Sequence, residues 1–78
     1  MALVLTDQAK SDLRSIDDPV HSKIEKEFQT IEMWPTSNPE LSYGRRYCPV
    51  SPFVILYSIT PNGDIVIEQI VHEHSNWK

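Results

Sequence analysis

Two histidines near the C-terminus and two adjacent arginines in the middle of the chain are the residues best suited to chemistry. His72 and His74 follow an apolar run at 65–71, and Arg45 and Arg46 are neighbours in the sequence. Histidine titrates near neutral pH and can transfer protons, and arginine can stabilise a negatively charged phosphorane. These four side chains could therefore cleave RNA, which needs a base for the 2′-hydroxyl and an acid for the leaving oxygen.

The same histidines also suggest metal binding. His72 and His74 are two residues apart, so they would project from one face of an extended strand and could chelate a metal ion. A structural zinc site normally has four ligands, and a catalytic one has three protein ligands. Cys48 and His21 are the only other soft candidates, and the pattern gives no reason for them to converge. We therefore expect no metal site and no cofactor.

Structural roles are the alternative for each of these residues. Arg45 and Arg46 alternate on a strand, so we expect one of them to be solvated or paired with a carboxylate of the helices. His72 would then close the end of the sheet by hydrogen bonding, and Trp77 would pack over an exposed edge of the core. Cys48 is the only cysteine and is expected to be a small buried hydrophobic residue.

The composition indicates one small domain at 1–78. The chain has 78 residues, of which 40% are hydrophobic, and a chain of this size buries only about 60–65% of its surface on folding. The net charge of -4 and the pI near 5.1 disfavour nucleic-acid binding, so no direct DNA binding is expected. The first apolar run, 3–5, stops at Thr6 and Asp7, which predicts a cytoplasmic protein without a signal peptide or membrane partner.

The first half of the chain predicts one strand and two helices. The run MALVL at 1–5 suits a strand, and apolar residues at helical spacing follow it. Asp18 can cap a second helix, Pro19 fits its first position and Pro35 ends it. The two helices should form an antiparallel hairpin, with apolar stripes made by Ala9, Leu13 and Ile16 in the first and Val20, Ile24, Phe28 and Ile31 in the second.

A loop and a weak strand come next. Turn-forming residues fill most of 35–40, which predicts a loop. The segment 42–50 reads as a strand, but Gly44 and Pro49 weaken it. We therefore expect this strand to lie at an edge or to carry a bulge.

Two stronger strands complete the predicted sheet. The segments 53–60 and 64–71 should pair antiparallel through a tight turn in which Asn62 and Gly63 supply the positive φ angles. Both segments have apolar residues on each face near their centres, so they should be interior strands with the helices covering one side. The predicted fold class is α+β: a strand, a helical hairpin and a three-stranded antiparallel sheet.

This order of elements, with LTDQAKSDLRSID, GRRYCPVSPFVILY and IVIEQIVHEHSNW along the chain, resembles the RelE/ParE superfamily of bacterial toxins. The PFVILY strand is similar to the family pattern P-Y-x-I-x-Y. The spacing from His72 to Trp77 is similar to the tail H-x-R-R-x-W of ParE-like members. The resemblance spans nearly the whole chain. It implies a sheet that curves around a helical hairpin and a cognate antitoxin that wraps and neutralises the toxin.

Two activities occur in this superfamily, and the resemblance leaves both open. RelE-like members cut mRNA in the ribosomal decoding site, with basic side chains on the concave face of the sheet. ParE-like members bind DNA gyrase and need no catalytic group. Here the strand at 53–60 has no basic residue, and His74 and Ser75 stand where the ParE-like tail has two arginines. Positive charge is confined to the neighbourhood of Arg45, Arg46 and Lys78.

The favoured interpretation is a ParE-like toxin that binds DNA gyrase and is not an enzyme. The residues expected to contact the target or the antitoxin are Arg45, Arg46, His72, His74 and Trp77. The first alternative is a ribosome-dependent mRNA endoribonuclease in which His72, His74, Arg45 and Arg46 are catalytic. The second is a non-toxic family member that serves as a protein-interaction module.

Overall fold

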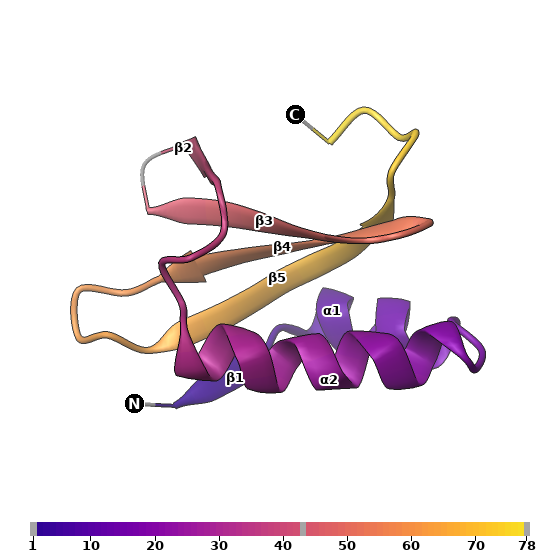
Figure 1. Ribbon diagram of the computed structural model, residues 1–78, viewed down its shortest axis with the longest axis horizontal. Coiled ribbons are helices and arrows are strands. Elements are labelled where there is room, and N and C mark those ends of the chain that lie inside the picture. The colour runs from indigo at the N-terminus through magenta and orange to yellow at the C-terminus, as the bar shows by residue number, and fades with distance from the viewer. Residues whose placement is uncertain (1, 43, 78) are drawn as a thin grey trace.

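Five strands and two helices make up the computed structural model, which describes residues 2–42 and 44–77. In chain order they are β1 (Leu3–Leu5), α1 (Asp7–Arg14), α2 (Val20–Met33), β2 (Glu40–Ser42), β3 (Arg45–Val50), β4 (Phe53–Ile59) and β5 (Ile65–His72). The strands form one sheet in the order β1-β5-β4-β3-β2, in which β1 is parallel to β5 and the other pairs are antiparallel. Both helices lie on one side of the sheet, as Figure 1 shows. The predicted α+β class is confirmed.

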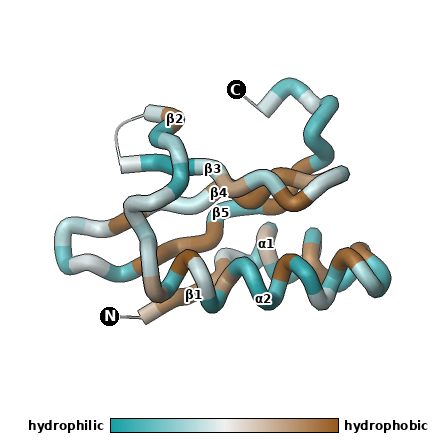
Figure 2. The backbone as a smooth tube through the Cα atoms, in the orientation of Figure 1, coloured by the Kyte–Doolittle hydropathy of each residue, from teal (hydrophilic) through white to brown (hydrophobic). Residues whose placement is uncertain are grey.

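The core lies between the helices and the sheet. On the strands, alternate side chains such as Ile55, Tyr57 and Ile67 point toward the helices and are fully buried. On the helices, the apolar stripes predicted from the sequence supply Ala9 and Ile24 to the same cluster. Figure 2 shows these apolar segments facing each other, with hydrophilic residues on the outer side of α2. The interior position of β4 and β5 is as predicted.

The ends of both helices follow local side-chain chemistry. The Thr6 hydroxyl accepts the Ala9 N–H at 3.1 Å and so caps α1. Asp18 accepts the Ser22 N–H at 3.1 Å, and its carboxylate thus satisfies an amide of the first turn of α2 as predicted. Pro19 immediately precedes this helix and is not its first residue. The helix ends at Met33, just before Pro35.

The prediction for the segment after α2 was incomplete. β2 (Glu40–Ser42) is a separate short strand that pairs with Arg45 and Arg46, and Gly44 lies between the two strands with a φ of 69°. The sheet therefore has five strands, and β2 takes the edge position expected for β3. Pro49 lies beyond the part of β3 that β2 covers, where its missing N–H breaks no ladder hydrogen bond.

The hairpin between β4 and β5 also differs from the prediction. Gly44 and Gly63 are the only residues with a positive φ in the described part of the chain, so Asn62 does not adopt the predicted conformation. The Gly63 N–H donates to the Thr60 carbonyl at 2.9 Å, and the Thr60 N–H donates to the Asp64 carbonyl at 2.8 Å. This pattern is that of a type I turn followed by a left-handed glycine, for which Pro61 favours the first central position.

Candidate functional site

The side of the sheet that faces away from the helices is the candidate interaction surface. By strand alternation, Arg45, Tyr47, Val54 and Leu56 point to this side, which we call the helix-free face. Val54 and Leu56 are only 2% and 1% exposed, although neither helix covers them. Neighbouring strands flank them, and the segment that follows β5 runs on this side of the sheet (Figure 1). The face therefore has a buried apolar layer, formed by Val54 and Leu56, and polar and aromatic side chains lie around and over it.

Arg45 forms an ion pair on the helix-free face. Its Nε donates to Glu68 Oε1 at 2.9 Å, and the two side chains are 39% and 30% exposed. In the register of the sheet, Arg45 lies opposite Ser58 of β4, and Ser58 lies opposite Val66 of β5. The Arg45 side chain therefore reaches across β4 to β5. The prediction of a carboxylate partner on the helices was wrong, because the partner belongs to the sheet.

A β-bulge in β5 positions Glu68. Tyr57 pairs with Ile67, whereas Leu56 pairs with Gln69, so Glu68 is the extra residue. With this insertion Ile67 and Ile70 both belong to the core, while Glu68 remains on the opposite face with Arg45. A regular strand could not place both isoleucines on the same face at this spacing.

The segment from β1 to α1 fixes the bulge from the other side of β5. The Thr6 hydroxyl donates to the Glu68 carbonyl at 2.6 Å, and the Thr6 N–H donates to the Ile67 carbonyl at 3.1 Å. Asp12 Oδ2 accepts the Ile70 N–H at 3.0 Å. These bonds satisfy backbone groups around the bulge, so the position of Glu68 is well defined.

Arg46 points to the side opposite Arg45. Its Nη1 donates to the Asn38 carbonyl at 2.7 Å and to the Thr36 carbonyl at 3.3 Å. The Tyr57 hydroxyl donates to the Pro35 carbonyl at 2.7 Å, and burial raises the pKa of this hydroxyl. Arg46 and Tyr57 together hold the loop that follows α2. The two adjacent arginines therefore point in opposite directions and do not form one basic site.

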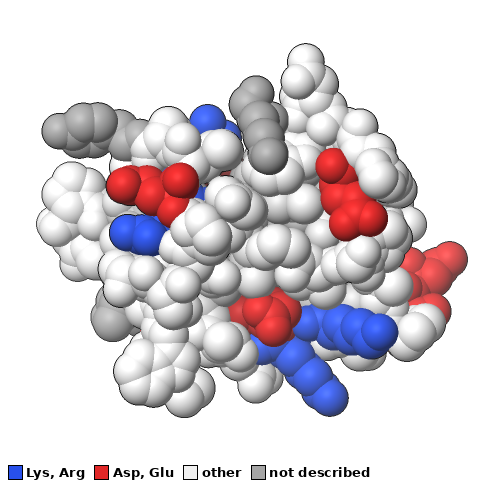
Figure 3. Space-filling view, turned by 45° about the horizontal axis from the view of Figure 1, so that its top comes forward, with Lys and Arg blue, Asp and Glu red and all other residues white. Residues whose placement is uncertain are grey.

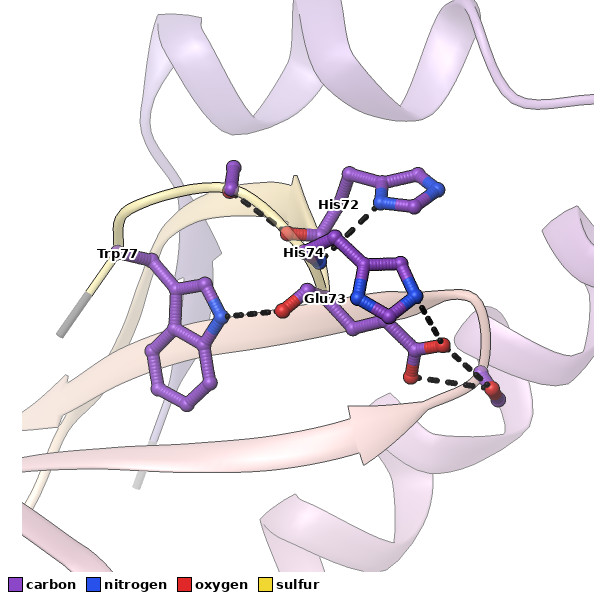
Figure 4. Close-up of polar contacts among 6 residues, drawn as sticks. His72, Glu73, His74 and Trp77 are labelled. Carbon is purple, nitrogen blue, oxygen red and sulfur yellow. Dashed lines mark hydrogen bonds and ion pairs between the residues drawn. The ribbon is translucent and has the colours of Figure 1, made fainter.

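The two histidines lie at the end of β5. The strand stops at His72, so His74 lies outside the extended strand on which it was predicted. The His74 N–H donates to His72 Nδ1 at 3.2 Å. The ring centroids are 5.3 Å apart, and His72 also contacts the Phe53 ring edge-on at 5.8 Å. His74 Nε2 lies 3.7 Å from Glu73 Oε1, and 81% of its side chain is exposed. Figure 4 shows His72, Glu73 and His74 at the end of β5.

Trp77 turns back onto the sheet. Its ring lies 5.2 Å from that of Tyr47, measured between centroids, and its Nε1 donates to the Glu73 carbonyl at 3.1 Å. In Figure 4 the Trp77 and His72 side chains project in different directions from the end of β5. Trp77 thus packs on Tyr47 of the helix-free face, and not over an edge of the core as the structural alternative expected. Lys78 lies outside the described residues.

Among the candidate catalytic residues, the two histidines are close together, but Arg45 is far from them. In the β4 register, Arg45 lies opposite Ser58 and His72 lies opposite Phe53. Five residues of strand separate these positions, which corresponds to roughly 17 Å. His72 also shares the side of Phe53, which packs against the core, whereas Arg45 is on the helix-free face. Within residues 2–42 and 44–77, no group of three His, Cys, Asp or Glu side chains is arranged to hold a metal ion.

Sequence reasoning missed two residues of the face, Glu68 and Tyr47. Glu68 interrupts the apolar pattern of IVIEQIV, which was the available signal for a bulge.

Figure 3 shows basic and acidic side chains close together on the surface in view, without one large basic patch. The face is therefore suited to hydrogen bonding and aromatic contact more than to binding a polyanion.

The fold and the sequence together define the class of the protein. The sequence profile of the family described as "ParE toxin of type II toxin-antitoxin system, parDE" matches residues 3–77. The protein is thus a type II toxin of the RelE/ParE superfamily. Within that superfamily, the chain belongs to the ParE toxin family. No curated protein matches the sequence.

Solved structures of RelE-type toxins and related toxins share this fold. A chain of the RelBE2 toxin-antitoxin complex from Mycobacterium tuberculosis is 17% identical, with a TM-score of 0.80 over 91% of this chain and 95% of that chain. The isolated E. coli RelE toxin is 14% identical, with a TM-score of 0.80 over 96% and 87%. A copper-bound mutant toxin from Helicobacter pylori is 16% identical, with a TM-score of 0.70 over 100% and 99%. At these identities the similarity concerns the fold.

The helices in the described part of the chain are too short and too polar to span a membrane.

Proposed function

We propose that this toxin acts by binding DNA gyrase and does not cut mRNA. The sequence match to the ParE family over residues 3–77 supports this mode of action. The observation that carries the proposal is the separation of Arg45 from His72 and His74. RNA cleavage needs a base, an acid and a cation within hydrogen-bond reach of one phosphate. Here the arginine and the histidines lie at opposite ends of the sheet.

The helix-free face supplies the features of a protein-binding surface. Protein interfaces are enriched in aromatic residues and arginine, and such residues carry much of the binding energy. Tyr47, Trp77 and Arg45 come from β3 and the C-terminal segment and lie on this face. Because Trp77 already packs on Tyr47, part of the surface is ordered before a target arrives, which lowers the entropic cost of binding.

We propose that a cognate antitoxin neutralises the toxin by covering other parts of the molecule. The Mycobacterium tuberculosis neighbour was solved as a toxin-antitoxin complex. Met33 and Trp34 are 68% and 62% exposed at the end of α2, and they offer apolar anchors for an amphipathic helix. β1 is an edge strand with Val4 49% exposed, and it can accept an added strand.

A supercoiling assay tests the proposed function. The purified toxin should inhibit DNA supercoiling by gyrase, and its induction in cells should block replication and induce the DNA-damage response. His72→Ala should affect this inhibition only through binding affinity, because the proposed mechanism uses no proton transfer and His72 is an expected contact residue. Cuts at defined codon positions in ribosome-bound mRNA, mapped by primer extension and abolished by His72→Ala, would contradict the proposal.

The ribosome-dependent endoribonuclease is the second candidate function. The proximity of the two imidazoles, 5.3 Å between centroids, supports it because one ring could act as base and the other as acid. The same primer-extension experiment decides between the two. A third candidate, a non-toxic interaction module, predicts normal growth on induction together with tight binding of the antitoxin.

A further inference from the structure

We infer that Glu68 determines which class of partner the helix-free face accepts. By neutralising Arg45, it lets the face bind a protein surface and excludes the phosphate backbone of nucleic acid. This inference rests on the proposed function, in which the target is a protein. Glu68 would be a specificity-determining residue that influences the choice of partner through Arg45.

Arg45 is the cation on which any phosphate contact at this face would depend. Among the described residues it is the only lysine or arginine on the helix-free face. The others are Lys10 and Arg14 on α1, Lys23 and Lys26 on α2, and Arg46, which points away and binds backbone carbonyls. Nucleic-acid affinity comes mainly from lysine and arginine contacts with phosphates. Within the described residues, one carboxylate is therefore enough to cancel the positive charge of this face.

The carboxylate of Glu68 is paired with Arg45, and the backbone that carries it is held by hydrogen bonds. The Nε to Oε1 distance is 2.9 Å, and both side chains are more than half shielded from solvent, which limits screening of the pair. The backbone of Glu68 is held by the 2.6 Å hydrogen bond from the Thr6 hydroxyl, and Asp12 holds the Ile70 amide. A phosphate that approached Arg45 would meet the negative charge of Glu68.

A protein partner meets no such barrier. Carbonyl oxygens and neutral donors can hydrogen-bond to the rim of the Arg45–Glu68 pair without separating the two charges, and the Tyr47 and Trp77 rings lie on the same face. Like charges placed against each other suppress wrong partners more than attractive pairs strengthen correct ones. The bulge in β5 thus contributes selectivity as well as core packing.

The experiment compares two substitutions that change the net charge equally. Glu68→Gln removes the carboxylate charge but keeps an acceptor for Arg45, and Glu32→Gln removes an exposed charge from α2. Binding of a fluorescent single-stranded RNA of about 12 nucleotides is measured by anisotropy in about 50 mM salt. We expect Glu68→Gln to bind at least tenfold more tightly than the wild type, with Glu32→Gln changing affinity less than twofold. The salt slope of Glu68→Gln should steepen by about 0.7 for one added phosphate contact.

Further variants separate the inference from its alternatives. Arg45→Gln in the Glu68→Gln background should return RNA affinity to the wild-type level. Melting temperatures identify any unfolded variant, and Glu68→Ala replaces Glu68→Gln if the latter does not fold. An equal gain in Glu32→Gln, or no gain in a folded Glu68 variant, would overturn the inference. Gyrase inhibition is measured in parallel, so a failure of the proposed function shows there in the wild type and is distinct from the RNA result.

Discussion

At Cys48, burial and a nearby carboxylate act in the same direction on the thiol. The side chain is 3% exposed, and its Sγ donates to Glu27 Oε2 of α2 at 3.0 Å. Burial first, and then the hydrogen bond to Glu27 and its negative charge, raise the pKa of Cys48 from 9.0 to about 12. The thiol therefore stays protonated at neutral pH and fills the core as a small apolar group, as predicted.

The reactivity of Cys48 should follow from this environment. We expect a thiol reagent at pH 8 to leave the native protein unlabelled for hours and to label it within minutes in denaturant, because only the exposed thiolate reacts. The folded pKa lies above the unfolded one, so the stability from the neutral thiol is present below about pH 9 and falls as the pH rises toward about 12. A Cys48→Ala variant should lack this particular fall in melting temperature. Rapid labelling of the native protein would contradict the assignment.

At the scale of single elements, the bulge in β5 depends on one side chain of α1. Asp12→Ala removes the acceptor of the Ile70 N–H and should lower the free energy of unfolding by about 1–3 kcal/mol, since a partly buried donor loses its partner. Asp12→Asn keeps an acceptor oxygen and is the matched control, with a smaller expected loss. Chemical denaturation of the three proteins measures the difference. Equal stabilities for Asp12→Ala and the wild type would show that water replaces the carboxylate without cost.

The hairpin between β4 and β5 gives a second test of an element. Gly63 has a φ of 87°, a conformation that a β-branched residue tolerates poorly. Gly63→Val should therefore destabilise the domain by about 1 kcal/mol or more. Asn62→Ala should change stability by less than about 0.5 kcal/mol, because Asn62 does not have a positive φ. Thermal melting of both variants checks the turn, and a large loss in Asn62→Ala would favour the tighter turn predicted from the sequence.

Elements were easier to predict than the contacts between them. The apolar periodicity located both helices and the two interior strands, because burial on one or both faces leaves a pattern in the sequence. β2 has three residues and no pattern of its own; its pairing with Arg45 and Arg46 makes it a strand. The partner of Arg45 was not predictable, since Glu68 is two strands away and reaches the face through a bulge. The roles in target or antitoxin binding that are expected for Arg45, Arg46, His72, His74 and Trp77 remain predictions.

For the whole molecule, the sign of the charge governs how an antitoxin can bind. The net charge is -4, and Arg45 is already neutralised by Glu68, so long-range attraction to an acidic partner should be weak. Apolar contact is little affected by salt, while exposed ion pairs weaken as the Debye length falls from about 10 Å at 0.1 M to about 3 Å at 1 M. We expect the affinity for the cognate antitoxin to fall less than about tenfold over this range, which is about 1.4 kcal/mol.

Calorimetric titration of the antitoxin at the two salt concentrations measures this change. Met33→Ser and Trp34→Ser should weaken binding at both concentrations by similar factors, because these exposed side chains offer apolar contact. A loss of a hundredfold or more in high salt would mean that a local basic surface dominates recognition.

The parallel pairing of β1 with β5 also constrains when the toxin can fold during its synthesis on the ribosome. β1 pairs with the first half of β5, in the register Leu3 with Ile65, Val4 with Val66 and Leu5 with Ile67. The first strand to be synthesised therefore cannot pair until the last one has been made. Until then α1 lacks the strand that it packs against, and its Asp12 lacks the Ile70 amide. We expect a nascent chain interrupted before residue 65 to remain unfolded and harmless. Toxicity would then appear only when β1 and β5, which come from opposite ends of the chain, have both been synthesised.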